Sequence, residues 1–140
     1  MWILYASLSA VAAALVAIFS KIGLRDVDAT LATIIRGVIM AVLLVLAGLA
    51  FKKFEGFSLS SFSSRAWIYI VLAAVAGASS WVLYFIALKA GPAGSVAVLD
   101  KMSVVLVLIF AALFLGEAFT IKSVLGIVLT VAGTLLILFK

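Results

Sequence analysis

The chain has 140 residues, of which 69% are hydrophobic and 11% are charged. A soluble domain of this length could not bury so much apolar surface, whereas a protein that crosses a bilayer several times turns that surface to lipid. The composition leaves no room for a separate soluble domain. We therefore expect residues 1–140 to form a single multi-pass unit of the cell membrane.

The composition also excludes several kinds of chemistry. The chain has no Cys and no His, which excludes disulfides and thiol chemistry and removes the usual zinc ligands. Five carboxylates are too few for a dedicated metal site, and no nucleophile–base pair is visible, so we expect no cofactor and no enzyme. The net charge of +5 comes mostly from basic residues at the ends of apolar runs. There they would anchor to headgroups, so the expected partner is membrane lipid and not nucleic acid.

Apolar runs of spanning length follow one another along the whole chain, separated by short polar segments. The first run has no basic segment before it and no cleavage site, so we interpret it as a retained helix. We expect Asp28 or Thr30 to cap the second helix and Thr120 to cap the fifth. The fold class is an all-α integral membrane protein whose five helices cover about residues 2–20, 29–51, 66–88, 94–116 and 121–139.

Small residues and aromatic rings mark the surfaces of these helices. Gly77 in the third helix, and Gly126 and Gly133 in the fifth, would allow helices to pack closely. The longest connection, residues 51–65, alternates Phe with Lys and Ser, which is typical of a segment at headgroup level.

The fourth helix carries an Asp–Lys pair, and charges at membrane depth usually face a partner, a cavity or a pathway. Asp100 and Lys101 lie about 9–10 Å inside the helix start, and adjacent helical residues point about 100° apart. We expect Asp100 to face a cavity and Lys101 to lean toward the near headgroups. Ser103 lies about one turn from Asp100 and could hydrogen-bond in the same site. The alternative is a buried pair that only fixes the helix register.

Arg36 lies about 10 Å inside the second helix, on the same side of the membrane as the entry to the fourth. An Arg36–Asp100 ion pair within one chain is geometrically possible, and pairing the two charges costs far less than isolating either. The alternative is that Arg36 reaches the near interface along its own side chain.

Trp81 and Tyr84 in the third helix either belong to an interfacial aromatic belt or line the wall of a cavity. Gly77 and Tyr84 share one face of that helix by their spacing. Glu117 comes just before the fifth helix, where a carboxylate is favoured by the helix dipole, and we interpret its role as structural.

The basic residues flanking the helices give no clear orientation. Those on the two sides of the membrane are Lys52, Lys53, Arg65 and Lys122 against Lys21, Arg25, Lys89 and Lys140, four against four. Such a balance is typical of dual topology, in which two copies insert in opposite senses and form an antiparallel dimer. The alternative is a single orientation set by the dense Lys52–Lys53 pair.

Several stretches are similar to those of a known family: LDKMSVV at 99–105, LFLGE at 113–117 and GIVLTVAGTLL at 126–136. With Arg36 preceding them, they resemble the short five-helix members of the EamA family, in the drug/metabolite transporter superfamily. The resemblance covers nearly the whole chain. It implies that this unit pairs as a homodimer, most simply antiparallel, since larger members join two inverted five-helix units that move small metabolites.

The chain also departs from the superfamily's patterns. Many members have Pro early in the fourth helix, about where this chain has residues 100–102. This difference weakens any inference about the substrate of this chain from the substrates of those members. The four-helix multidrug exporters depend on a carboxylate in helix one, which this chain lacks.

The leading functional hypothesis is transport of a small polar or amphipathic metabolite by alternating access between two five-helix units. Asp100 would bind a coupling ion or a substrate ammonium group, and Arg36 would be its counter-ion or contact a carboxylate. Trp81 and Tyr84 would contact the apolar part of the substrate. The alternatives are a flippase for a lipid-linked carrier and a non-transporting membrane subunit of a larger complex.

Overall fold

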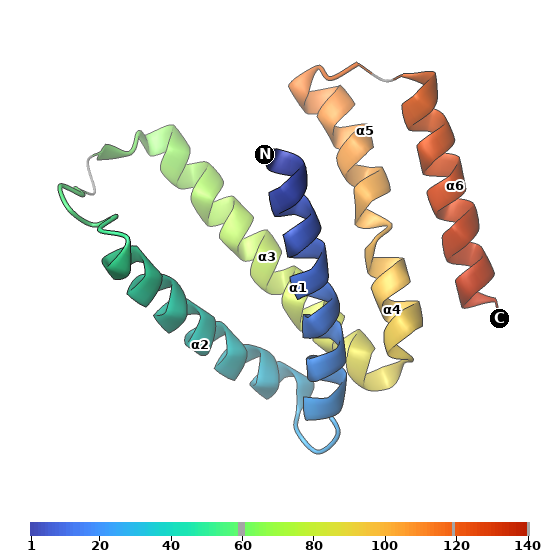
Figure 1. Cartoon of the computed structure of the whole chain (residues 1–140), viewed down its shortest axis with the longest axis horizontal. Coiled ribbons are helices and arrows are strands. Elements are labelled where there is room, and N and C mark those ends of the chain that lie inside the picture. The colour runs from blue at the N-terminus through green and yellow to red at the C-terminus, as the bar shows by residue number, and fades with distance from the viewer. Residues whose placement is uncertain (59–60, 119, 140) are drawn as a thin grey trace. The chain divides into compact units, whose positions relative to one another are not determined.

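A computed structural model shows an all-helical chain and describes residues 1–58, 61–118 and 120–139. Five stretches in these ranges are long and apolar enough to cross a membrane, which confirms the expected fold class. The fourth stretch, Ala93–Leu115, is made of two helices placed end to end. The helices are α1 (Trp2–Gly23), α2 (Ala29–Ala50), α3 (Ser64–Ala90), α4 (Ala93–Asp100), α5 (Ser103–Leu115) and α6 (Ile121–Leu138) (Figure 1).

The helix ends follow local signals in the sequence. The Asp28 carboxylate accepts a hydrogen bond from the Leu31 N–H at 2.9 Å, and the Thr120 hydroxyl accepts one from the Ser123 N–H at 3.2 Å. Both satisfy a backbone donor that has no partner within its own helix, so the two predicted caps are confirmed. At the C-terminal end of α5, Gly116 has φ +69°, a left-handed conformation that ends the helix.

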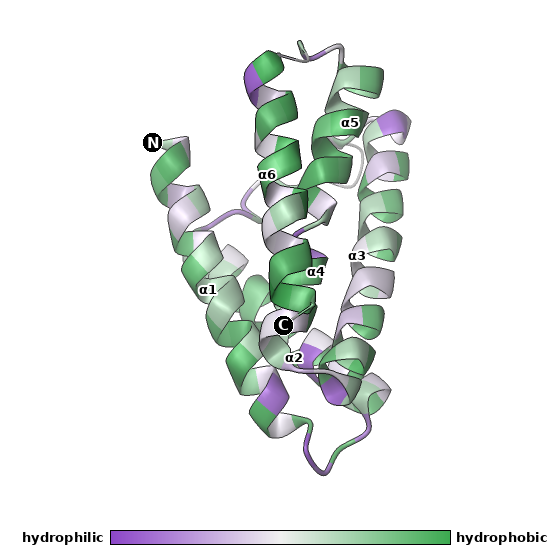
Figure 2. Ribbon diagram, turned by 90° about the vertical axis from the view of Figure 1, so that its right-hand side faces the viewer, coloured by the Kyte–Doolittle hydropathy of each residue, from purple (hydrophilic) through white to green (hydrophobic). Residues whose placement is uncertain are grey.

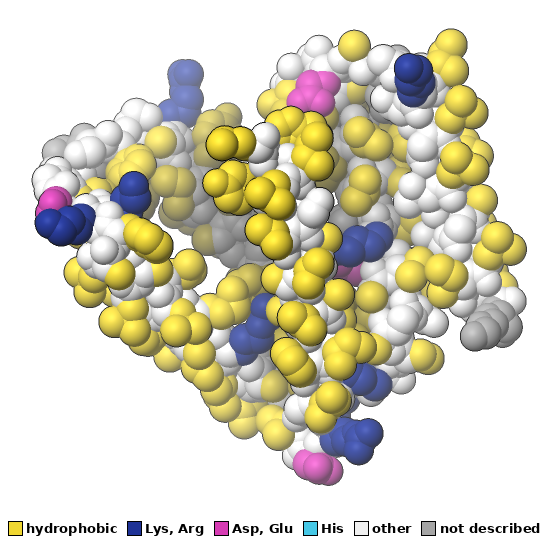
Figure 3. Space-filling model, in the orientation of Figure 1, with side chains coloured by type: hydrophobic (Ala, Val, Ile, Leu, Met, Phe, Trp, Pro, Cys, Tyr) yellow, Lys and Arg dark blue, Asp and Glu magenta, His cyan; other side chains and the backbone are white. Residues whose placement is uncertain are grey.

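Hydrophobic residues dominate every span (Figure 2), and many of their large apolar side chains are exposed on the surface of the chain (Figure 3). Among the described residues, few apolar side chains are buried within the chain, Leu88 and Phe85 among them. A surface this apolar is stable only against lipid tails or another membrane protein. The exposed faces therefore agree with a multi-pass membrane location.

The chain divides into two compact units, which we describe separately. The α2–α3 unit comprises residues 20–89, and its two helices run in opposite directions around the connection that follows α2. The α4–α6 unit comprises residues 1–19 and 90–140, and in it α6 packs against both α4 and α5 (Figure 1).

The two ends of the α2–α3 unit are held by different contacts. At one end, the Lys21 ammonium donates to the Leu88 carbonyl at 2.6 Å and the Lys89 ammonium donates to the Val27 carbonyl at 2.7 Å. These bonds tie the end of α3 to the end of α1 and to the segment between α1 and α2. They use lysines in the last helical turns to satisfy backbone carbonyls, as is common at helix C-termini.

At the other end, aromatic rings pack in series. The ring centroids of Phe54 and Phe57 lie 6.4 Å apart, those of Phe57 and Phe62 lie 5.9 Å apart, and that of Trp67 lies 5.7 Å from Phe62. Gly48 makes room for this cluster, because a Cβ there would lie 2.6 Å from the Phe54 ring. The rings join the connection to the start of α3, consistent with a segment at headgroup level.

The left-handed Gly116 gives a test of the α5 terminus. We expect Gly116→Ala to lower the unfolding free energy by about 1–2 kcal/mol, because a Cβ disfavours this conformation. Thermal unfolding in detergent measures the effect. The matched control is Gly23→Ala, where the glycine is helical and a Cβ would meet nothing within 4 Å. Equal melting temperatures for the two variants would contradict the prediction.

Candidate functional site

The fourth span is interrupted at its charged pair, in contrast to the continuous helix expected over 94–116. α4 ends at Asp100 and α5 begins at Ser103. Between them, Lys101 has φ −67° and ψ −10°, and Met102 has φ −61° and ψ −19°. These angles are closer to a 3₁₀ turn than to an α-helix.

The hydrogen bonds at the junction show the same tightening. The N–H groups of Met102 and Val104 donate to the carbonyls three residues earlier, Leu99 and Lys101, each at 3.0 Å. Bonds of this kind close a tighter turn than α-helical bonds, and a 3₁₀ segment within a helix often marks a hinge or a functional position. The chain therefore has two half-helices whose ends meet at the Asp–Lys pair.

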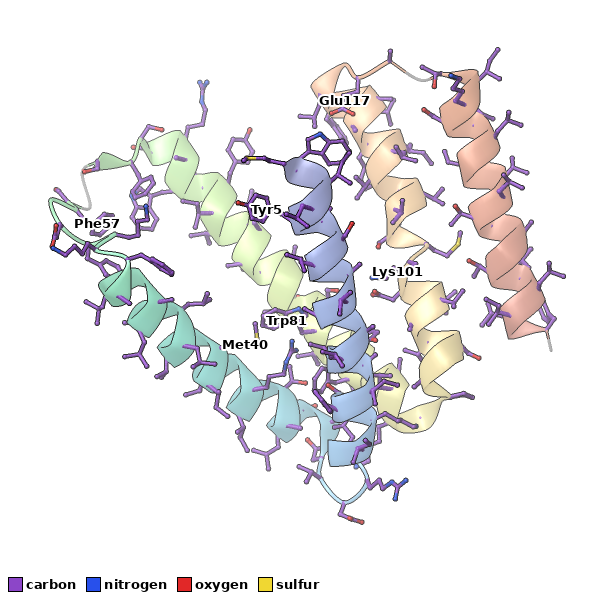
Figure 4. All side chains as sticks on the ribbon, viewed as in Figure 1. Tyr5, Met40, Phe57, Trp81, Lys101 and Glu117 are labelled. Atoms are coloured by element: carbon purple, nitrogen blue, oxygen red, sulfur yellow. The ribbon has the colours of Figure 1, made fainter. Side chains whose placement is uncertain are left out.

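The two charges of the junction pair with each other. The Lys101 ammonium lies 3.8 Å from an Asp100 carboxylate oxygen, and the side chains are 60% and 39% exposed. The expectation that Asp100 faces a cavity and Lys101 leans toward the headgroups stays a prediction. Their pairing reduces the cost of placing both charges within a span. Figure 4 shows Lys101 at the α4–α5 junction.

Arg36 lies within the α2–α3 unit and is held by aromatic rings of α3. Its guanidinium carbon is 4.8 Å from the centroid of the Trp81 ring and 5.1 Å from that of Phe85. Tyr84, on the turn between them, interacts electrostatically with the same guanidinium. A cation over an aromatic face is stabilised by about 0.5–2 kcal/mol, more as water is removed. The stacking favours an inward-facing Arg36 over one that extends to the headgroups.

Phe85 is a contact of Arg36 that the sequence analysis missed. It follows Trp81 by four residues, a spacing that places both rings on one face of α3. Its side chain is only 3% exposed, so it also belongs to the small interior of the chain. The four-residue spacing from Trp81 was the available signal.

The other candidates stay predictions. Arg36 belongs to one compact unit and Asp100 to the other, so their ion pair is still to be tested. Ser103 is the exposed first residue of α5, and its hydrogen bond to Asp100 is likewise still to be tested. Glu117 lies in the connection between α5 and α6, where its N–H donates to the Ala111 carbonyl at 3.2 Å (Figure 4).

The three candidate packing glycines lie on open surface of the chain. A Cβ at Gly77, Gly126 or Gly133 would meet nothing within 4 Å, so their role in helix packing also stays a prediction. In the part of the chain that the structure describes, no group of three carboxylates is placed to hold a metal ion.

The Arg36–Trp81 contact can be measured by a double-mutant cycle. We expect the double variant Arg36→Gln/Trp81→Leu to lose less unfolding free energy than the sum of the two single variants. The difference, which is the coupling energy, should be about 0.5–2 kcal/mol. Thermal unfolding of the four proteins in detergent gives the coupling. The control pairs Arg36→Gln with Trp67→Leu, since Trp67 packs on Phe62 and not on Arg36. A coupling of zero for Arg36 and Trp81 would contradict the stacking.

Comparison with known proteins gives the family. Residues 1–139 match the EamA-like transporter family. A protein of Sinorhizobium sp, described as an uncharacterized transporter in the cobO 3′ region, is 40% identical over 136 residues, which cover 97% of this chain and 95% of the relative. No solved structure matches the chain. Since the family match spans nearly every residue and the relative aligns over 95% of its length, this protein belongs to the EamA-like transporter family of the drug/metabolite superfamily.

Proposed function

We propose that the protein is a secondary transporter that binds a small polar or amphipathic metabolite at the interruption of its fourth span. The observation that carries the proposal is the junction of α4 and α5 at the Asp100–Lys101 pair. Irregular backbone at membrane depth is tolerated where it lines a cavity or is covered by protein, and intramembrane charges mark substrate or ion pathways.

The junction offers groups of both signs to a substrate. The N–H groups of Met102, Val104 and Val105 already donate to carbonyls three residues earlier, so the groups left for a substrate are side chains. Secondary transporters place interrupted helices at their substrate and ion sites. Asp100 would bind a substrate ammonium group or a coupling ion, and Lys101 would attract a carboxylate. Ser103 would add a neutral hydrogen bond.

Arg36 is a further candidate contact for a substrate, within the α2–α3 unit. Stacking on Trp81 and Phe85 covers the faces of its guanidinium and leaves the N–H donors at the edges for a carboxylate. Trp81 and Tyr84 would then also contact the apolar part of the substrate. A zwitterionic metabolite with an apolar portion fits this set of groups.

Alternating access needs a second unit. We propose an antiparallel homodimer, because one chain provides five spans and the basic residues balance across the membrane in the sequence. Lys140, one of those residues, lies outside the described part of the chain. The open space around Gly77, Gly126 and Gly133 supports a dimer in which these faces meet a second copy. Transport would then proceed by rocking of one unit against the other.

The role of Asp100 is tested by ligand-dependent stability. We expect at least one amino acid or related metabolite to raise the melting temperature of the purified protein with dose, since a ligand at 100 times its Kd stabilises the folded state by about 2.7 kcal/mol. We expect Asp100→Asn to abolish that shift while the protein stays folded. Glu117→Gln is the matched control, because it neutralises a carboxylate outside the spans and should keep the shift.

Two outcomes would contradict this assignment. An equal ligand-dependent shift in melting temperature in wild type and Asp100→Asn would show that the Asp100 carboxylate does not bind the ligand. A rise in melting temperature with a lipid-linked sugar carrier, but with no soluble metabolite, would favour a flippase for lipid-linked carriers over a metabolite transporter. Uptake of the same compound into proteoliposomes, lost in Asp100→Asn, separates a transporter from a non-transporting subunit.

Dual topology is tested by labelling single cysteines in a chain that has none of its own. Ser61→Cys is nearly isosteric and lies in the exposed connection after α2, and Val27→Cys lies on the opposite side of the membrane. For an antiparallel dimer, we expect an impermeant maleimide added to intact cells to label about half of each population. Full labelling at one position and none at the other would show a single orientation.

A further inference from the structure

The α2–α3 unit contains a hollow that the proposed transport site does not use. Its walls are Lys21, Ile22, Leu24, Arg25 and Lys89, and it encloses about 250 Å³. We call this hollow the basic pocket, because three of its five lining residues are cations. All five come from the end of α1, the residues just after it and the last turn of α3.

Two of the three cations are held in place by the backbone. The Lys21 ammonium bonds the Leu88 carbonyl at 2.6 Å, and the Lys89 ammonium bonds the Val27 carbonyl at 2.7 Å. Lysine side chains at a membrane surface are ordinarily mobile, and fixing them in advance lowers the entropy lost on binding. An ammonium has three donors, so Lys89 keeps two beyond the bond to Val27.

The third cation, Arg25, lines the pocket and is exposed. Its planar guanidinium presents paired donors that match a phosphate better than an ammonium does. No carboxylate of the described residues lies within 4 Å of Arg25 or Lys89. The nearby Asp28 carboxylate is turned to the Leu31 N–H as a helix cap. The positive charges of Arg25 and Lys89 are therefore not paired with a carboxylate among the described residues.

The size and position of the pocket limit its ligand. A volume of about 250 Å³ is below the usual range for drug-sized ligands and suits a single phosphate group with a small substituent. Leu24 is buried and Ile22 is exposed, so an apolar wall lies beside the cations. Because the pocket lies at the ends of two apolar spans, it would be at the depth of lipid phosphates and also reachable from water.

We propose that the basic pocket binds a phosphate monoester or diester anion, carried either by a phospholipid headgroup or by a soluble phosphate. The Arg25 guanidinium donates hydrogen bonds to two phosphate oxygens, and the Lys89 ammonium donates a third. Lys21 attracts the anion by its charge. Ile22 contacts the carbon substituent of the phosphate. The pocket is separate from the Asp100–Lys101 junction, and its binding does not depend on the proposed transport function.

The test is direct binding to the full-length protein in a neutral detergent. Calorimetric titration is done with dihexanoyl phosphatidylglycerol, kept below its micelle concentration, and in parallel with glycerol 3-phosphate. We expect saturable binding in wild type and a Kd raised about tenfold or more in Arg25→Gln, since a hydrogen bond to a charged group contributes about 1.5–3 kcal/mol. Arg25→Lys should lie between the two, because it keeps the charge and loses the planar fork.

A matched variant separates a built site from general attraction. Lys53→Gln removes one exposed cation from the connection after α2, away from the pocket, and should bind like wild type. Arg25 makes no structural hydrogen bond among the described contacts, so Arg25→Gln should keep the wild-type melting temperature.

The two ligands distinguish the sources of the phosphate. Binding of both identifies a site for soluble phosphates that also accepts lipid, and binding of the phospholipid alone identifies a headgroup site. The proposal is overturned if neither ligand binds, if Arg25→Gln binds as tightly as wild type, or if Lys53→Gln weakens binding by the same factor.

Discussion

The structure depends on one constraint: in hydrocarbon, every backbone N–H and carbonyl must find its hydrogen bond within the protein. That constraint makes all five spans helical and leaves their apolar side chains facing outward. It also makes the tightened turn at Lys101 and Met102 the most informative departure from regular α-helical hydrogen bonding in the spans. Helix ends within a span are tolerated where polar surroundings exist, and here they coincide with an ion pair inside the fourth span.

The sequence was sufficient for the spans and their caps but not for the junction. The apolar runs predicted five helices, and the positions of Asp28 and Thr120 predicted two of the caps, because these signals are local. The interruption after Asp100 was not predicted. Residues 100–102 contain no Pro or Gly, and a change from α-helical to tighter hydrogen bonds leaves the hydrophobic pattern of the span unchanged.

The contacts of Arg36 differ from those that its residue type suggested. A charge at membrane depth needs a partner, and the partner expected for Arg36 was a carboxylate. The structure gives it aromatic rings of α3, because residues four apart on one helix lie side by side and together cover a flat guanidinium. The four-residue spacing from Trp81 puts Phe85 on the same face of α3, but the contact with Arg36 also requires that α2 pack against α3.

The lysine bond that ties the end of α3 to the end of α1 has a consequence for biogenesis. Lys21 and its acceptor at Leu88 are separated by 67 residues. At about 5–20 residues per second, the ribosome needs roughly 3–13 seconds to make the intervening chain. During that interval the ammonium of Lys21 is free to interact with lipid and the insertion machinery. Once α3 is complete, the Lys21 ammonium can bond the Leu88 carbonyl. Reversing the orientation of α1 across the membrane after that point would require this bond to break.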